Sequence, residues 1–146
     1  MIRHPAEWDR LRADPQGVAR IATEECLRYD PPVKSTQRIA VADVELRGKT
    51  IRKGDRLRWF MAAANRDPRA FERPDEFDIS RQPNPHVSFG SGIHYCLGAT
   101  LARVEGQEVF RALAERYPRL ALDTDRLEYS PSIQFRSLKA LPVRIA

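Results

Sequence analysis

A ten-residue segment, Phe89-Gly90-Ser91-Gly92-Ile93-His94-Tyr95-Cys96-Leu97-Gly98, constrains this 146-residue chain more than any other feature. It sets one cysteine in a glycine-rich loop directly ahead of an amphipathic stretch. Glycines take backbone angles closed to other residues and let a flat ligand approach the main chain. A cysteine at the start of a helix meets the positive end of the helix dipole and unpaired N–H groups, which favour thiolate over thiol. The segment therefore predicts a loop that presents a thiolate to a metal.

The segment matches the pattern Phe-Gly-x-Gly-x-His-x-Cys-x-Gly, so the chain resembles the haem-binding end of the cytochromes P450. The resemblance implies that haem b is the cofactor and that Cys96 is its metal ligand. It also places the other signature positions in the cofactor site, namely Phe89, Gly90, Gly92, His94 and Gly98.

The family frame gives these positions separate roles. The glycines shape the loop, and Phe89 shields the sulfur from water. His94 matches a position that contacts a haem propionate. Arg38, just inside the first predicted strand, matches an arginine that commonly reaches a propionate. An arginine suits that task because its planar fork pairs with a carboxylate through two hydrogen bonds.

A second motif is the pair Glu25-x-x-Arg28, which stands before Tyr29-Asp30-Pro31-Pro32. At positions i and i+3 of a helix the two side chains are neighbours and can form a salt bridge. Glu25 shares a helix face with Val18, Ile21 and Ala22, which predicts that the pair is buried. The pair resembles the family's structural Glu-x-x-Arg, which braces the haem-side core.

The family adds a third, basic member to that pair from a proline-rich segment. The local match is Phe71-x-x-Pro74-x-x-Phe77, where the position before the last phenylalanine is often basic, but this chain has Glu76 there. Arg73 and Arg81 are the two candidates to replace it.

Two segments far apart in the sequence align with substrate-contacting segments of the family. One follows Pro-Pro-Val and the other lies near the C-terminus, and the possible substrate contacts are Lys34, Ser35, Gln134 and Phe135. Their mixture of polar and bulky side chains is compatible with a pocket lining and does not identify a substrate.

The pattern of apolar residues predicts a mainly α-helical fold with small β-sheets, the C-terminal part of a P450 fold, and one unit over residues 1–146 without a second domain. Helices are expected over 4–14, 16–29 and 97–117, with apolar stripes on the last that suit a buried helix. Strands are expected over 36–41 and 43–47, and an alternating strand at Leu57, Trp59 and Met61. One helical turn is expected over 62–66 and a meander over 68–85. Ile133/Phe135 and Leu141/Val143/Ile145 predict a C-terminal strand pair.

Composition is typical of a globular protein, with 42% hydrophobic and 31% charged residues and a net charge of +5. The basic residues are interleaved with acidic ones, which predicts a solvated surface and neither a nucleic-acid nor a membrane partner. A basic patch for an acidic electron-transfer protein stays open. The sequence shows no apolar run of transmembrane length and no secretory h-region, and Cys26 and Cys96 do not suggest a disulfide framework. We therefore expect a cytoplasmic protein.

The resemblance covers only the C-terminal part of a P450, without the central helix that bears the family's proton-delivering acid–alcohol pair. We therefore expect a P450 monooxygenase fragment. It would take electrons from a ferredoxin or flavoprotein reductase and, when complete, insert one oxygen atom into a small organic substrate. No catalytic residue is predicted within it.

Alternative functions stay open. The chain could be a truncated haem-binding or interaction module without turnover, which would show the haem spectrum without product. A basic nucleic-acid-binding domain would show salt-sensitive binding and no pigment. A zinc site is disfavoured because Cys96 and His94 lack partners at ligand spacing. A Cys–His hydrolase lacks a third orienting group.

Overall fold

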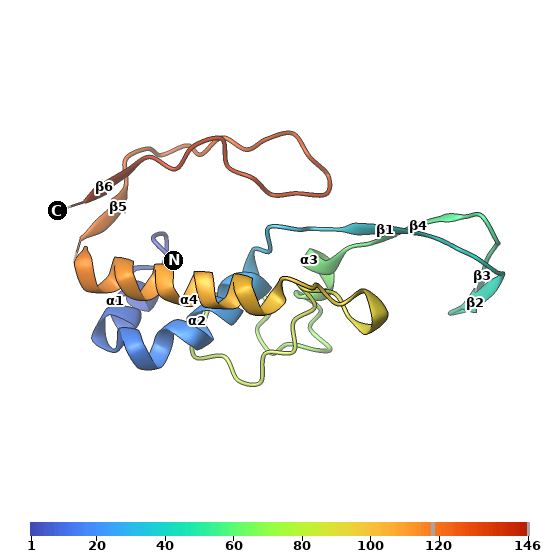
Figure 1. Cartoon of the computed structure of the whole chain (residues 1–146), viewed down its shortest axis with the longest axis horizontal. Helices are drawn as coiled ribbons and strands as arrows, with labels where there is room; N and C mark the ends of the chain where they lie inside the picture. Colours follow the sequence, from blue (N-terminus) through green and yellow to red (C-terminus); the bar gives the residue numbers. More distant parts are fainter. Residues whose placement is uncertain (118, 146) are drawn as a thin grey trace.

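Two N-terminal helices and one long helix after the cysteine loop form the packed body of the chain (Figure 1). The computed structural model describes residues 1–117 and 119–145. The helices are α1 (Pro5–Ala13), α2 (Pro15–Tyr29) and α4 (Ala99–Arg116). Each lies within two residues of its predicted bounds, so the three helix predictions are confirmed.

Helix α2 begins and ends where its local chemistry requires. The Asp14 side chain accepts a hydrogen bond from the Gly17 amide at 2.9 Å, which caps the first turn. Pro15 occupies the first helical position, where a missing N–H is harmless. Beyond Asp30 two prolines follow, and a proline disfavours helical geometry in the residue before it.

Helices α2 and α4 pack against each other at close range. A Cβ atom at Gly106 of α4 would lie 2.8 Å from Cγ2 of Thr23 on α2, so only glycine allows this approach. The Thr23 hydroxyl is buried and donates to the Ala19 carbonyl at 2.8 Å. The core between the helices and the meander consists of Trp8, Leu11, Ala19, Ala22, Phe77, Ile79 and Ala114.

A two-stranded β arm extends from one end of the helical body (Figure 1). Strand β1 (Thr36–Ile39) pairs antiparallel with β4 (Arg56–Trp59), and Thr36 lies opposite Trp59. Beyond them, β2 (Val44–Leu46) pairs with β3 (Lys49–Ile51) at the tip. Strands at the places of β1, β2 and β4 were predicted, although β1 is shorter than expected, whereas β3 and the pairing of the strands were not predicted.

The short helix α3 (Met61–Ala64) follows the arm, one residue earlier than predicted. Met61 is buried at its start, so the prediction that Met61 ends the alternating strand is wrong. The meander over 68–85 has no helix or strand, as expected. It wraps against α2 through Phe71, Phe77 and Ile79, which are buried.

The C-terminal strand pairing differs from the prediction. Strand β5 (Leu120–Leu122) pairs with β6 (Val143–Ile145). Phe135, expected to pair with the last strand, instead forms a bridge with Val33. Pairing partners depend on the path of the chain between strands, which the local alternation of side chains does not encode.

Only one face of α4 is buried, so the prediction of a buried helix holds in part. Ala114 is buried and Phe110 and Leu113 pack partly against the core. The stripe Leu97, Leu101 and Val104, together with Val109, is at least half exposed.

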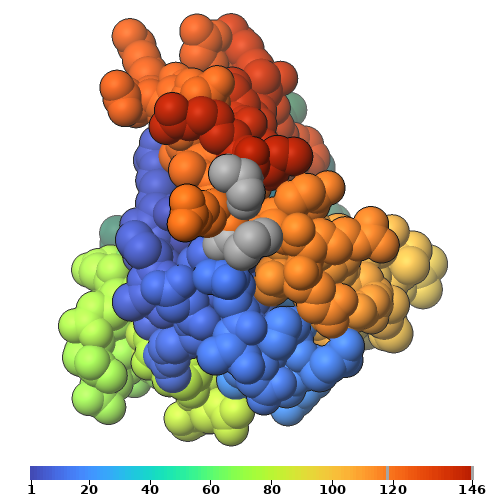
Figure 2. Space-filling model, turned by 90° about the vertical axis from the view of Figure 1, so that its left-hand side faces the viewer, coloured from blue at the N-terminus to red at the C-terminus, as the bar shows by residue number. Residues whose placement is uncertain are grey.

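An apolar cavity of about 570 Å³ lies between α1, α4 and the C-terminal segment, with Cys26, Phe110 and Leu113 in its wall. Figure 2 shows this end of the molecule, with the N-terminal helices in blue, α4 in orange and the C-terminal segment in red above them. None of the helices in the described part of the chain is both long and apolar enough to span a membrane.

Candidate functional site

The loop from Phe89 to Gly98 is a tight turn built by its own backbone. The Cys96 amide donates to the Phe89 carbonyl at 2.9 Å, and the Gly90 amide donates to Val87 at 2.8 Å. A single 3₁₀ turn, η1 (Gly92–His94), lies between them. Gly90 and Gly92 have φ angles of 72° and 65°, a left-handed conformation that side chains rarely adopt. These two glycines are therefore required by the turn.

Gly98 has a different position from the other two glycines. It caps the N-terminus of α4 with φ −84°, which any residue can adopt. A Cβ atom there would lie 4.0 Å from the Cys96 sulfur, an ordinary contact distance. The turn therefore does not require glycine at this position, and its glycine leaves the space beside the sulfur clear.

Cys96 lies just before α4, with its thiol exposed. Its carbonyl accepts from the Ala99 amide at 3.2 Å, which fixes it against the first turn of the helix. Cys96 thus stands at the N-terminal end of α4, the positive end of the helix dipole.

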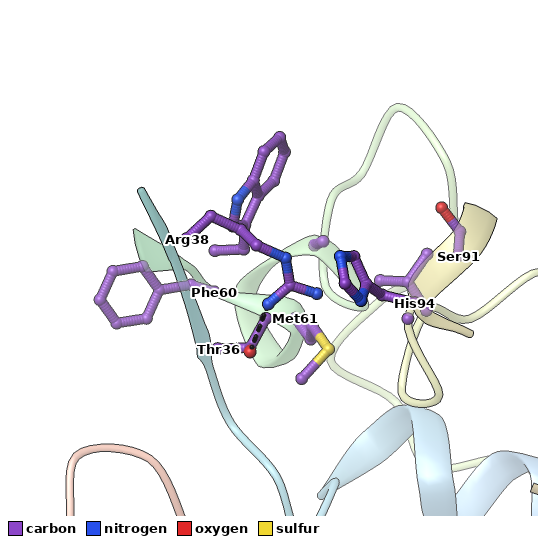
Figure 3. Close-up of a pocket in the computed structure, with 10 residues that line it drawn as sticks. Thr36, Arg38, Phe60, Met61, Ser91 and His94 are labelled. Atoms are coloured by element: carbon purple, nitrogen blue, oxygen red, sulfur yellow. Dashed lines mark hydrogen bonds between the residues drawn. The ribbon is translucent and has the colours of Figure 1, made fainter. Parts of the chain in front are cut away.

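A cavity of about 420 Å³ opens between the β arm and the cysteine loop. Figure 3 shows Arg38 of β1 and His94 of the loop pointing toward each other across it. Arg38 is held by hydrogen bonds from its Nη1 to the Thr36 hydroxyl at 3.2 Å and to the Gln37 carbonyl at 2.7 Å. Among the residues that the structure describes, no acid lines the cavity; the lining residues are Thr36, Arg38, Trp59, Phe60, Met61, Ala64, Val87, Gly90, Ser91 and His94.

The Glu25–Arg28 pair is completely buried, as predicted, and its two side chains meet at 2.7 Å. Arg28 uses all its donors: Nε and Nη2 bond Glu25, while Nη1 and Nη2 together bond three carbonyls. These carbonyls belong to Asn65, Pro74 and Glu76. The pair thus ties α2 to α3 and to the meander.

Arg81 is the third, basic member of this cluster. Its Nε lies 3.2 Å from Oε2 of Glu25, and its side chain is 9% exposed. Arg73 instead pairs with Glu76 at the surface, so that candidate is wrong. Glu25 also accepts from the Asp78 amide and from Asn84 Nδ2, so its carboxylate is fully hydrogen-bonded.

The two predicted substrate segments are brought together, although they lie about a hundred residues apart. The Lys34 amide donates to the Gln134 carbonyl at 2.7 Å, and Phe135 forms a bridge with Val33. Ser35 is completely buried, and its hydroxyl donates to Ile133 and accepts from Arg58. Its side chain thus holds the segments together and does not face open space.

A set of buried or partly buried polar residues that lie beside the loop was not assigned to the site from the sequence. Asn65 is fully buried, and its side chain accepts from the Val87 amide and donates to Ser88. Glu24, His86 and Arg103 form a separate cluster. The sequence signals for this cluster were the positions of its members: Glu24 is next to Glu25, His86 precedes the loop, and Arg103 lies in the second turn of α4. Nowhere in residues 1–117 and 119–145 do three or more His, Cys, Asp or Glu side chains gather as metal ligands.

The chain matches the family model described as "Cytochrome P450" over residues 19–129. The chain belongs to the cytochrome P450 family. It is 46% identical over 143 residues to the biotin biosynthesis cytochrome P450 of Bacillus subtilis, covering 98% of this chain and 36% of that protein. It is 45% identical over 147 residues to the monooxygenase PikC of Streptomyces venezuelae, covering 99% of this chain and 35% of that protein.

Solved P450 structures share the fold described above. The crystal structure of P450BioI with a hexadec-9Z-enoic acid ligated acyl carrier protein matches with a TM-score of 0.92 at 46% identity, over 99% of this chain and 37% of that one. CYP109E1 from Bacillus megaterium, in complex with corticosterone, matches with a TM-score of 0.94 at 37% identity, over 99% and 39%. The chain thus spans about 36% of the length of the curated P450 it resembles at 46% identity.

P450 proteins carry haem, and the residues present here fit that group. Two nitrogen-bearing side chains, Arg38 and His94, converge on a cavity that no acid of residues 1–117 and 119–145 lines, which suits the two propionates of haem. Trp59, Phe60 and Met61 offer apolar surface to a flat ring. Cys96 is not itself part of the cavity lining, but it belongs to the loop that forms one wall.

Proposed function

We propose that this chain holds haem b through the Cys96 thiolate and provides the thiolate side of a monooxygenase site. The observation that carries the proposal is the convergence of Arg38 and His94 on one cavity whose wall is the cysteine loop (Figure 3). Residues 1–146 act as one unit in this role.

Each part of the site has a definite task under this proposal. Cys96 presents its sulfur as an anion, Arg38 and His94 orient the propionates, and Gly90 and Gly92 hold the turn. Phe89, whose carbonyl accepts from the Cys96 amide, limits access of water to the sulfur. When bound, thiolate-ligated haem supplies oxygen activation, since the thiolate donates electron density that favours O–O cleavage.

The substrate we propose is a small apolar organic molecule. Related P450s have been crystallised with a fatty acyl chain and with a steroid, which are both largely hydrocarbon. The paired segments around Lys34 and Gln134 stand as candidate substrate contacts, with Phe135 half exposed beside them. Electrons come from a ferredoxin or a flavoprotein reductase, and a reducing cytoplasm keeps the exposed Cys96 thiol free of oxidation.

A haem-binding module without turnover is the second candidate function. The observation that favours it is the exposure of the loop and of the start of α4, where Ile93 and Leu97 are almost fully exposed. Such a module has the same haem spectrum as the monooxygenase and forms no product.

The experiment that tests haem ligation is reconstitution of the folded chain with haemin. We expect the reduced carbon-monoxide complex of the wild type and of Cys26→Ser to show a thiolate-type band, and that of Cys96→Ser to lack it. The same band in all three proteins, or its loss in Cys26→Ser alone, contradicts the assignment.

A further inference from the structure

Glu24 and Glu25 are adjacent in α2 but serve different parts of the molecule. Successive helix residues point about 100° apart, so Glu25 reaches the meander while Glu24 reaches Arg103 of α4 and His86, which precedes the cysteine loop. Arg103 of α4 grips the Glu24 carboxylate with two nitrogens: Nε lies 2.7 Å from Oε1 and Nη2 lies 3.1 Å from Oε2. His86, whose side chain is 2% exposed, places Nε2 at 3.0 Å from the same carboxylate.

Arg103 extends this contact to the loop that carries the cysteine. Its Nη1 donates to the Tyr95 hydroxyl at 2.8 Å, and its guanidinium lies 4.5 Å from the centre of the Phe89 ring. Tyr95 precedes Cys96 in the chain, and the Phe89 carbonyl accepts from the Cys96 amide at 2.9 Å. The guanidinium of Arg103 therefore contacts two aromatic residues: Tyr95, which is next to Cys96 in the chain, and Phe89, whose carbonyl binds the Cys96 amide.

Apart from these contacts with Arg103, the described part of the chain gives the loop few contacts with other elements. Residues 91–98 are all exposed, and their backbone hydrogen bonds stay within a few residues of the loop. In the part of the chain that the structure describes, Tyr95 is the only residue from 89 to 98 whose side chain hydrogen-bonds another element. A loop with so few contacts depends on the partners that fix its aromatic residues.

The protonation states of the cluster follow from its hydrogen bonds. The Ser88 amide donates to Nδ1 of His86 at 3.3 Å, so the ring proton is on Nε2 and is donated to Glu24. Burial lowers the pKa of His86, which keeps the ring neutral. Burial works against ionisation of Glu24, but the bonds from Arg103 and His86 outweigh it and lower the pKa of that carboxyl. The anion and cation are thus both fixed at neutral pH.

We infer that Glu24 is a positioning residue for the Cys96 thiolate and acts through Arg103. The carboxylate fixes the guanidinium, and the guanidinium fixes Phe89 and Tyr95. The loop backbone between them then presents the sulfur in one orientation. The inference rests on the proposed function because it assigns Glu24 to the support of the haem ligand.

The test compares Glu24→Gln, which keeps the shape but removes the charge, with a matched control. The control is Glu108→Gln, which breaks another Glu–Arg pair of α4, with Arg111 Nε at 3.2 Å, away from the loop. In the haemin-loaded chain we expect Glu24→Gln to weaken haem binding by about tenfold and to shift the reduced carbon-monoxide spectrum away from the thiolate band. We expect Glu108→Gln to have the haem affinity and the reduced carbon-monoxide spectrum of the wild type.

Two further measurements show whether Glu24 acts through Arg103. In an Arg103→Met background, Glu24→Gln adds no further loss of haem affinity. In the haem-free chain, amide hydrogen exchange over residues 89–98 is faster in Glu24→Gln than in the control. The second measurement keeps this inference separate from haem ligation. If the wild type forms no thiolate complex, the proposed function fails while loop exchange still decides whether Glu24 braces the loop.

The inference is overturned if Glu24→Gln has the haem affinity and loop exchange of the wild type. The inference is also overturned if Glu24→Gln lowers haem affinity as much in the Arg103→Met background as in the wild type, since Glu24 then does not act through Arg103. If Glu24→Gln does not fold, Arg103→Lys carries the same test, because it keeps a charge but removes the stacking on Phe89 and the two-nitrogen grip on Glu24.

Discussion

The two cysteines of the chain have very different surroundings. Cys26 lies in the wall of the apolar cavity between α1 and α4, where burial raises the pKa of its thiol to about 11. Cys96 is exposed at the start of α4. Because the thiolate is the reactive form, these surroundings predict different reactivity for the two side chains.

We expect iodoacetamide to label Cys96 and to spare Cys26 in the folded, haem-free chain. At pH 8.5 a thiol of pKa about 11 is only about 0.3% thiolate, and raising the pH toward 11 removes this protection. Mass spectrometry of the two cysteine peptides measures the ratio, and the urea-unfolded chain, in which both react, is the control. Equal labelling of both cysteines in the folded chain would contradict the raised pKa of the partly buried Cys26.

Single residues also show what the sequence could not decide. Glu76 occupies the position where a basic residue was expected, and Arg73 and Arg81 were equal candidates. Arg81 reaches Glu25 because the meander returns to α2 after Phe77, while Arg73 stays at the surface. The choice depends on the path of an irregular segment, and such a path has no periodic signal.

At the scale of elements, helices were predicted well because their signals are local. The caps and the 3.6-residue spacing that define α2 lie within its own sequence. Strand partners were predicted poorly: β6 pairs with β5, and Phe135 pairs with Val33 across about a hundred residues. The candidate loop was predicted from its ten residues. The contacts of Glu24 and Arg103 that support it were not predicted, because they join three elements that are far apart in the sequence.

The Glu25–Arg28 pair binds the elements around α2 into one core. Replacing Glu25 with alanine leaves the buried Arg28 and the nearly buried Arg81 without their carboxylate. We expect Glu25→Ala to lower the free energy of unfolding by about 3–5 kcal/mol, as when one partner of a buried ion pair is removed. In a domain of about 5–15 kcal/mol total stability, much of the protein would be found unfolded or insoluble.

The measurement is urea unfolding followed by circular dichroism, with Glu108→Ala as the control. Glu108 forms the same i, i+3 pair with Arg111, but at the surface of α4. We expect its midpoint to stay near that of the wild type, because exposed pairs contribute little. A shared midpoint for Glu25→Ala and Glu108→Ala would show that the buried pair does not hold the core.

At the scale of the whole molecule, apolar surface is distributed unevenly. The helical body has a packed core, while the loop, the first half of α4 and the β arm expose large apolar side chains. Among these are Ile39, Val41, Trp59, Phe60, Ile93, Leu97 and Leu101. Apolar stripes predicted that α4 is buried, but a stripe carries no information on whether a second layer covers it. Trp59 and Phe60 also line the cavity between Arg38 and His94 and are half exposed, so the cavity is open to water on that side.

This openness predicts how the 146 residues behave as a catalyst. With haemin, a reductant and a competent electron-transfer protein, we expect electrons to be consumed with little substrate hydroxylated. The residues lining the cavity, in the part of the chain that the structure describes, include no carboxylic acid to deliver protons in a controlled way. Water has free access, so partly reduced oxygen leaves as peroxide before it reacts with substrate.

The measurement is the amount of product and of peroxide formed for each electron consumed. A chain reconstituted with zinc protoporphyrin, which has no redox-active iron, controls for electrons lost without the haem iron. Tight coupling of electrons to product would contradict the prediction and would show that the chain, alone or as an oligomer, closes its own site.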